Sequence, residues 1–285
     1  MKENNLSLLI DSIPEIYQSH GRNSNIYKLL ENIFQEEINN NFLKYNESIL
    51  HFTQFGEIKL PFYQMGAISS INLFGLDEFI IFAYYWKNKN NYRNVVDIGA
   101  NIGLHSIILS RCGYNVTSYE PDPIHFKILK QNLKLNEIKN ANLINSAVSD
   151  KDGFSNFVRV VGNSTSSHLE GSKDNAYGKL EKFEVKTINV DSVFKDIDFI
   201  KMDVEGAESK IILSTGSEHW ATTEMMLEVG NEKNASAIFS HLKKIGINSF
   251  SQKNGWAIVR TLEDIPNNYK EGSLFITKKD FMNWF

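Results

Sequence analysis

The sequence of 285 residues contains one cysteine, Cys112, and no excess of basic residues. A single cysteine cannot form a disulfide within the chain, which favours a reducing compartment, so we expect a cytoplasmic protein. The formal net charge of -4 comes from 30 lysines and arginines against 34 aspartates and glutamates. A chain without a positive field is a poor candidate for binding nucleic acid, and we expect no such partner.

We also expect no segment that targets the chain to a membrane or spans one. The first residues, Met1–Asn5, do not form a basic region followed by a long apolar core, so we expect no signal peptide. The longest apolar run, Phe79–Trp86, is far too short to cross a bilayer. With 42% hydrophobic and 22% charged residues the composition is globular, and the length suits one large domain with an extension. We expect a mostly helical extension over residues 1–75 and the main domain over residues 76–285.

The most informative stretch, Val95–Pro121, predicts a strand, a glycine turn, a helix and a second strand. Gly99 and Gly103 enclose the turn, and Glu120 ends the second strand. A βαβ unit of this kind places a nucleotide-like ligand over the carboxyl ends of its strands. The glycines let the backbone turn sharply and approach that ligand.

The sequence of the turn indicates which ligand is expected. It reads Gly99-Ala100-Asn101-Ile102-Gly103, whereas a dinucleotide-binding turn reads G-x-G-x-x-G and holds a pyrophosphate. Asp97, two residues before the first glycine, would repel a pyrophosphate, which disfavours a nicotinamide dehydrogenase. S-adenosylmethionine (SAM) carries a positive ammonium and a positive sulfonium and no phosphate, so it suits this acidic strand end. Glu120 can accept hydrogen bonds from its ribose hydroxyls.

Strand and helix patterns alternate along the main domain, which predicts an α/β fold with a doubly wound, Rossmann-like sheet of seven strands. Two further strand patterns, Phe154–Val161 and Phe183–Val190, interrupt the alternation and flank the polar loop Gly162–Gly178. They predict an inserted β-hairpin. The core strands are expected at residues 95–98, 116–119, 142–147, 198–202 and 224–229, and the last strands among 248–252, 257–260 and 273–277.

The amino-terminal extension carries little functional information. Apolar residues at helical spacing predict two or three helices that cap the main domain. These helices can shape a substrate pocket, form a contact in a homo-oligomer, or act as scaffold alone.

Five elements follow one another in the main domain: Asp97–Gly103, Tyr119–Asp122, Ser146–Ser149, the Ser/Thr-rich loop near Asn163, and Ile200–Glu208. These motifs resemble those of the FkbM-type SAM-dependent methyltransferases. Their order and spacing cover about residues 76–228, so the first 70 residues fall outside the resemblance. The resemblance implies the class I methyltransferase fold, SAM as the cofactor, and O-methylation of a hydroxyl group, often on a sugar or a natural product.

Two groups of site residues follow from these motifs. A hydroxyl is a poor nucleophile until it loses its proton, so a base is expected near the methyl group. Asp203, at the end of the fourth strand, is the first choice, and Glu205, Glu228 and the loop residue His168 are the alternatives. Acids in the first turn of a helix are also favourable against the helix dipole without any catalytic duty. The residues expected to hold SAM are Asp97, Gly99, Ala100, Asn101, Gly103, Glu120, Pro121, Asp122, Ser146, Ala147 and Asp203.

Several assignments leave an alternative open. Asp122 can serve as the cap of the following helix instead of binding SAM. Asp203, Glu228 and Asn231 come from neighbouring strand ends and could hold a divalent metal, but hydrogen bonds to a polyhydroxylated acceptor are favoured, and we assign no metal site. His105, in the first helix after the turn, is expected to be structural.

The function also has alternatives. A methyltransferase for protein or nucleic acid is disfavoured because the chain lacks basic patches and the Asn/Asp-Pro-Pro-aromatic tetrad of amino-group methylases. A SAM-binding module without catalysis is disfavoured by the acids at the fourth and fifth strand ends. The expected partner is a hydroxylated small molecule or glycan.

Overall fold

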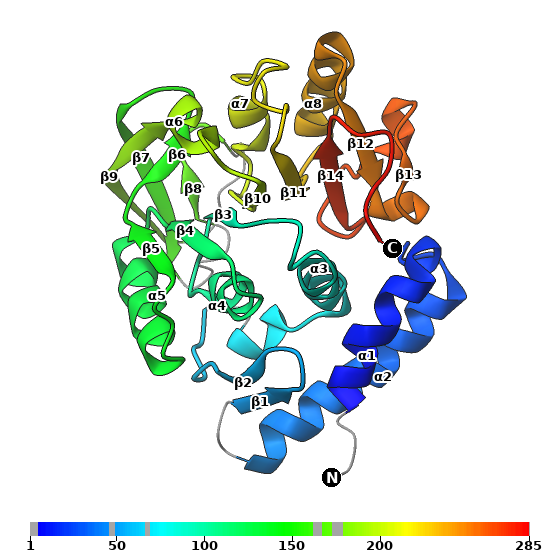
Figure 1. Ribbon diagram of the computed structural model, residues 1–285. Helices are drawn as coiled ribbons and strands as arrows, with labels where there is room; N and C mark the ends of the chain where they lie inside the picture. Colours follow the sequence, from blue (N-terminus) through cyan, green and yellow to red (C-terminus); the bar gives the residue numbers. More distant parts are fainter. Residues whose placement is uncertain (1–4, 46–48, 66–68, 162–166, 173–178, 285) are drawn as a thin grey trace.

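The computed structural model describes residues 5–45, 49–65, 69–161, 167–172 and 179–284 of the chain. Its largest element is an eight-stranded sheet with the order β13-β12-β14-β11-β10-β3-β4-β5 (Figure 1). The strands are β3 (Asn94–Ile98), β4 (Asn115–Tyr119), β5 (Ala141–Ile144), β10 (Phe199–Met202), β11 (Glu224–Glu228), β12 (Asn248–Ser251), β13 (Ala257–Ile258) and β14 (Ser273–Thr277).

The connections of this sheet make it doubly wound. From β3 the chain adds β4 and β5 on one side, and later it adds β10 and β11 on the other side, all in parallel. The last strand, β14, runs antiparallel between β11 and β12. The predicted Rossmann-like sheet is therefore confirmed, with the two-residue β13 added at the edge as an eighth strand. The order reverses between β3 and β10, and a reversal of this kind opens a crevice for a ligand.

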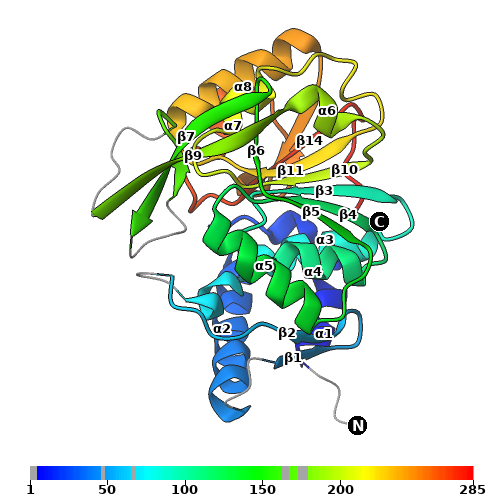
Figure 2. The same ribbon diagram turned by 90° about the vertical axis from the view of Figure 1, so that its left-hand side faces the viewer.

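Helices cover both faces of the sheet (Figure 2). The helices α3 (Leu76–Lys87), α4 (Leu104–Arg111) and α5 (Pro123–Leu135) lie on one face, and α6 (Val190–Phe194), α7 (Glu208–Ile212) and α8 (Glu232–Ile245) lie on the other. Each face encloses its own cluster of buried apolar side chains. Among the helices of the described ranges, none combines the length and the apolarity needed to cross a bilayer.

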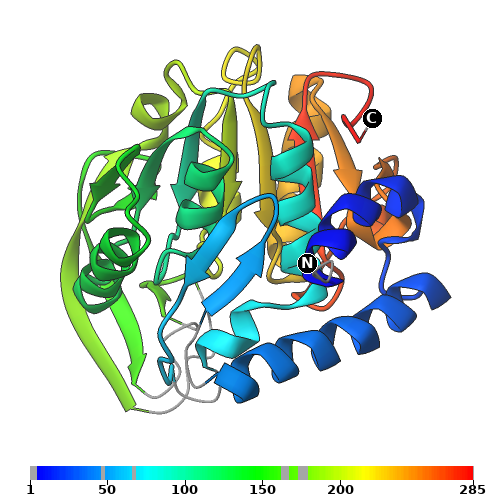
Figure 3. The same ribbon diagram turned by 60° about the horizontal axis from the view of Figure 1, so that its bottom comes forward.

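The amino-terminal segment packs against the outer side of the α3 layer. Figure 3 shows the long helix α2 (Asn25–Tyr45) running past the hairpin of β1 (Ile49–Phe52) and β2 (Gly56–Lys59). Helices were expected here, and the segment contains this hairpin as well. The segment also contains α1 (Asn5–Ser12) and the 3-10 helices η1 (Ile13–Ser19) and η2 (Ser70–Leu73). Its buried apolar residues join the same cluster as those of α3.

A second, four-stranded sheet follows β5, with the order β6-β9-β7-β8. The pairing of β7 (Gly153–Val161) with β9 (Lys179–Asn189) is antiparallel and confirms the inserted hairpin. The third core strand ends earlier than expected, because β6 (Ala147–Ser149) pairs with β9 instead of extending the main sheet. The loop after β7 contains β8 (His168–Leu169). The residues Asn163–Ser166 that entered the family resemblance lie outside the described residues.

Candidate active site

A cavity of about 400 Å³ lies at the carboxyl ends of the central strands, where the strand order reverses. Its volume is in the usual range of sites for small ligands, roughly 300–1,000 Å³. Of the residues predicted to form the site, those that line the cavity are Gly99, Asn101, Glu120, Pro121, Ser146, Ala147, Asp203, Glu205 and Glu228. The strand ends thus bring together residues that are far apart in the sequence.

The turn after β3 requires glycine. Gly99 has a φ of +79°, and a Cβ atom there would lie 1.7 Å from the carbonyl oxygen of Asp203. The amides of Gly99 and Ala100 both donate to the carbonyl of Tyr119 at 3.0 Å. Gly103 ends the turn with a φ of +96°, at the start of α4. The turn therefore lies directly against the end of β10. Ala100 and Gly103 belong to the turn but do not line the cavity.

Glu120 is held in place by the backbone. Its side chain is buried, Oε2 accepts from the amide of Asn101 at 2.8 Å, and Oε1 accepts from the amide of Asp122 at 2.8 Å. Burial raises the pKa of Glu120 to about 8, although the two amide donors oppose that shift. A carboxylate fixed in this way at the edge of the cavity can accept hydrogen bonds from vicinal hydroxyls.

Asp97 lies beneath the cavity instead of lining it. It is fully buried, accepts from the hydroxyl of Ser106 at 2.6 Å, and has its Oδ1 atom 3.7 Å from Nζ of Lys201. Lys201 stands opposite Asp97 in the β10–β3 register, and its Nζ is 3.9 Å from Oδ2 of Asp203. Burial opposes the charge of Lys201, but the carboxylates of Asp97 and Asp203 outweigh it and raise the lysine pKa. Lys201 thus connects the floor of the cavity to its wall.

Two acids converge at the end of the cavity that faces β10 and β11. Asp203 follows β10 and Glu228 ends β11. Burial, followed by the nearby charges of Asp203 and Glu78, raises the pKa of Glu228 well above its ordinary value. One oxygen of Asp203, Oδ1, is buried and accepts no hydrogen bond from the residues that the structure describes. These carboxyl groups can accept protons or hydrogen bonds from a hydroxylated molecule.

A tyrosine from the carboxyl-terminal part of the chain closes this end. The hydroxyl of Tyr269 donates to Oε2 of Glu205 at 2.9 Å, and both residues line the cavity. Glu205 itself has a φ of +55°, which is uncommon for a residue with a side chain. Sequence reasoning missed Tyr269 because it lies in a loop far from every motif.

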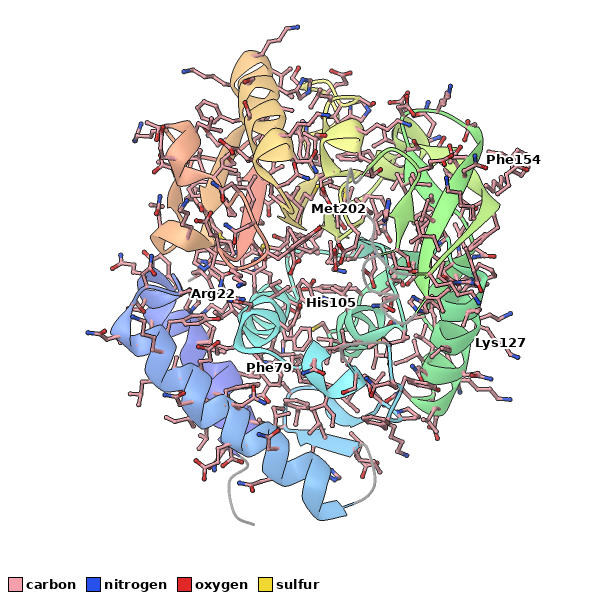
Figure 4. All side chains as sticks on the ribbon, turned by 180° about the vertical axis from the view of Figure 1, so that it is seen from behind. Arg22, Phe79, His105, Lys127, Phe154 and Met202 are labelled. Atoms are coloured by element: carbon pink, nitrogen blue, oxygen red, sulfur yellow. The ribbon has the colours of Figure 1, made fainter. Side chains whose placement is uncertain are left out.

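The helix α3 adds a carboxylate from outside the predicted motifs. Glu78 lines the cavity, and its Oε2 atom lies 2.7 Å from Nε2 of His105. Burial favours the neutral acid, but the adjacent His105 outweighs it and lowers the pKa of Glu78. Figure 4 shows His105 between α3 and α4, toward the interior of the molecule. His105, expected to be structural, thus orients a cavity residue. No sequence signal marked Glu78, whereas a lone lysine in an apolar strand could have marked Lys201.

Two predicted site residues face other partners. Asp122 caps α5 by accepting from the amide of Ile124 at 2.8 Å, and both of its oxygens accept from Arg159. Of the alternatives open for Asp122, the helix cap is confirmed. His168 is buried on β8 between Ser167 and Leu169, which line the cavity. Because side chains alternate along a strand, His168 is directed to the opposite face.

Two further polar residues, which follow β10 and β11, form hydrogen bonds within the fold. Glu208 is buried and accepts from the amide of Gly206 at 2.8 Å and from Nδ2 of Asn234 at 2.5 Å. Asn231 caps α8 by accepting from the amide of Asn234 at 2.8 Å. Its side-chain oxygen, one of the three groups considered as metal ligands from the sequence, is therefore already occupied. Within the described ranges, no group of three or more His, Cys, Asp and Glu side chains is arranged to hold a metal ion.

The residues present fit the cofactor that the sequence predicts. The Gly99 turn leaves no room for a side chain at the point where the backbone borders the cavity. Glu120 provides an acceptor for ribose hydroxyls, and the inserted sheet adds an apolar wall that includes Val148, Phe157 and Leu169. Such a wall suits an adenine ring, which buries apolar surface. Carboxylates occupy the opposite end, where a sulfonium would be favoured.

The fold defines a Rossmann-like α/β protein with a cavity at the carboxyl ends of its central strands. Residues 97–246 match the family model described as the methyltransferase FkbM domain. The chain belongs to the FkbM methyltransferase domain family.

Individual relatives are more distant. The methyltransferase sdnD of Sordaria araneosa is 28% identical, with 44% of this chain and 61% of that protein covered. The chain therefore covers less than two thirds of that relative. Among solved structures, the precorrin-6y C5,15-methyltransferase of Geobacter metallireducens has a TM-score of 0.37 and 15% identity, over 67% of this chain and 82% of that chain. The METTL16 MTase domain has a TM-score of 0.42 and 10% identity, over 72% and 68%. These structural similarities are weak, so the fold assignment depends on the strand order described above.

Proposed function

We propose that the protein is a SAM-dependent O-methyltransferase that acts on a hydroxyl of a saccharide or another hydroxylated small molecule. One juxtaposition supports this proposal above all. The glycine turn and Glu120 form a place for the cofactor, and a group of carboxylates borders the same cavity directly beside it. Membership of the FkbM methyltransferase domain family agrees with this function.

SAM would supply a methyl group on a positive sulfonium, with a neutral thioether as the leaving group. The backbone of the Gly99 turn would hold its methionine part, and Glu120 would accept from its ribose. Alignment of acceptor oxygen, methyl carbon and sulfur supplies much of the rate of such a displacement. Asp203 is the residue we assign to take the acceptor proton, because it borders the cavity at the end of β10.

The charge of the cavity favours a neutral or cationic acceptor. Its described lining includes Glu78, Asp203, Glu205 and Glu228, and it includes no lysine or arginine. Carboxylates accept hydrogen bonds from hydroxyl and ammonium groups but repel phosphates. This distribution supports a hydroxylated small molecule over a nucleic acid. A cytoplasmic location and a homo-oligomer stay predictions.

Calorimetric titration with SAM, S-adenosylhomocysteine (SAH) and NAD tests the cofactor. Binding of both adenosyl ligands at micromolar concentration and none of NAD is expected. Transfer of a labelled methyl group to a panel of mono- and oligosaccharides and small polyols then tests the reaction. Binding of SAM without transfer to any panel member would favour the non-catalytic SAM-binding module. Binding of NAD in place of SAH would contradict the proposal.

Asp203→Asn is expected to lower kcat by about a hundredfold, the usual size of the loss when a general base is removed. The amide keeps the shape of the side chain, so the Kd for SAH should change by less than about threefold. The measurement is initial-rate kinetics with the acceptor found in the panel, alongside calorimetry. Asp280→Asn, an exposed surface change, is the control. Equal kcat values for Asp203→Asn and the control would remove Asp203 from the proton-transfer role.

The affinity for SAH is expected to depend on pH through Glu120. Ribose hydroxyls donate to the ionised carboxylate, and the pKa of about 8 leaves Glu120 largely protonated in the free protein at neutral pH. Binding must then release a proton, so affinity should rise by about tenfold between about pH 6.5 and about pH 9. Calorimetry of the wild type and of Glu120→Gln across this range checks the result. A Glu120→Gln variant that shows the same rise would assign it to another group.

A further inference from the structure

The inserted sheet forms one wall of the cavity through a hydrophobic cluster of its own. Phe157 on β7 and Leu169 on β8 stand opposite each other in the register and both line the cavity. With Ala147, Val185 and Ala207 they form a buried cluster that is separate from the clusters on the two faces of the main sheet. The position of this wall therefore depends on what fixes the inserted sheet to the main sheet.

Arg159 makes one such connection, to the segment between β4 and α5. It lies two residues after Phe157 on β7, so both side chains are on the same face of the strand. Its Nε and Nη2 atoms donate to the two oxygens of Asp122, at 2.7 and 2.6 Å. This is the bidentate geometry that makes arginine–carboxylate pairs strong and directional. The Asp122 side chain is only 1% exposed and that of Arg159 is 14% exposed, so water screens the pair little.

The other side of Arg159 contacts the aromatic part of the wall. Its Cζ atom lies 4.6 Å from the centre of the Phe183 ring. The rings of Phe183 and Phe157 lie 5.5 Å apart, centre to centre. The guanidinium thus packs on one ring, that ring packs on a second, and the second borders the cavity.

Asp122 carries the connection toward the other half of the same pocket. Its backbone amide donates to Oε1 of Glu120 at 2.8 Å, and its side chain caps α5. A change in Asp122 therefore changes the support of the carboxylate that faces the cavity. The pair with Arg159 is placed to fix both the apolar wall and Glu120.

We propose that Arg159 is a positioning residue for the adenosine part of the cofactor, acting through Asp122 on Glu120 and through Phe183 on Phe157. This inference rests on the proposed function, because it takes SAM as the ligand. Breaking a buried ion pair leaves an uncompensated charge, here on Asp122. That charge would draw water or repack the segment between Glu120 and α5.

The test is calorimetry with two ligands, SAH and 5′-methylthioadenosine, which shares the adenosine but lacks the amino-acid part. Arg159→Ala is expected to raise the Kd of both by about tenfold or more, since both depend on the same half of the pocket. Arg159→Lys should raise both Kd values less, because it restores the charge without the bidentate geometry. Glu181→Gln is the matched control. It removes the exposed partner of Arg159, 47% exposed and bonded at 2.9 Å, and should leave both Kd values within about twofold.

The thermal midpoint of each unliganded variant separates positioning from general destabilisation. A variant that is folded at the titration temperature and binds both ligands as tightly as the wild type would overturn the inference and leave the proposed function standing. Failure of the wild type to bind SAH would instead contradict the proposed function. If Arg159→Ala does not fold, Arg159→Lys and Phe183→Leu decide. Phe183→Leu keeps the ion pair but removes the ring, and unchanged Kd values in both variants would overturn the inference.

Discussion

Gly99→Ala is expected to abolish detectable SAH binding and to destabilise the protein by about 4 kcal/mol or more, at the extreme end of single substitutions. Two effects combine at this position. The backbone has a φ of +79°, and the added Cβ would lie 1.7 Å from the carbonyl oxygen of Asp203. The obstacle is backbone, so no side chain can rotate away. Either the turn or the end of β10 has to move, and both border the cavity.

Gly113→Ala separates the two effects. Gly113 also has a positive φ, +93°, but a Cβ there would meet nothing within 4 Å. In this variant a side chain has to adopt a positive φ but meets no other atom. Its free energy of unfolding should therefore fall by only about 1 kcal/mol, and it should keep its affinity for SAH. Urea denaturation and SAH calorimetry on both variants make the comparison. If Gly99→Ala were no less stable than Gly113→Ala and bound SAH equally well, the result would contradict the close packing of the turn against the end of β10.

The turn could be predicted from the sequence because its chemistry is local. Gly99, Gly103 and Glu120 lie within one βαβ unit, and their spacing is set by the geometry of that unit. The cap at Asp122 is local in the same sense, since aspartate followed by proline starts a helix in many contexts. The inserted hairpin could be predicted because the residue pattern alternates along both of its strands.

The rest of the site could not be predicted because it is assembled from distant segments. Glu78 comes from a helix that precedes every motif, and Tyr269 comes from a loop that follows them all. Neither position has a pattern of its own that marks it. The partner of Asp122 is Arg159, 37 residues further on in a sheet whose packing no local rule specifies. Asp97 shows a second limit. The motif located it at the strand end but did not reveal that its side chain is buried between Ser106 and Lys201 and does not line the cavity.

The second large effect is expected at the charge pair under the cavity. Lys201→Met should destabilise the protein by about 3–5 kcal/mol, the usual result of removing one partner of a buried ion pair. Asp97 is 0% exposed, and its Oδ1 atom has Lys201 at 3.7 Å as its counter-charge. Methionine fills a similar volume, so the loss of stability would come from the uncompensated carboxylate and not from a cavity. Urea denaturation at about pH 7 measures it.

An exposed pair provides the control for Lys201→Met. Lys210 lies 3.0 Å from Asp150, with side chains 47% and 38% exposed, and Lys210→Met should cost less than about 1 kcal/mol. The double variant Asp97→Asn/Lys201→Met should recover part of the loss, because neither member of the buried pair is then charged.

The double variant gives an independent check on the origin of the loss. If the deficit of Lys201→Met persists undiminished in Asp97→Asn/Lys201→Met, the loss would be attributed to packing in place of charge. Lys201 would then only occupy space in the sheet interior instead of acting as the counter-ion of Asp97.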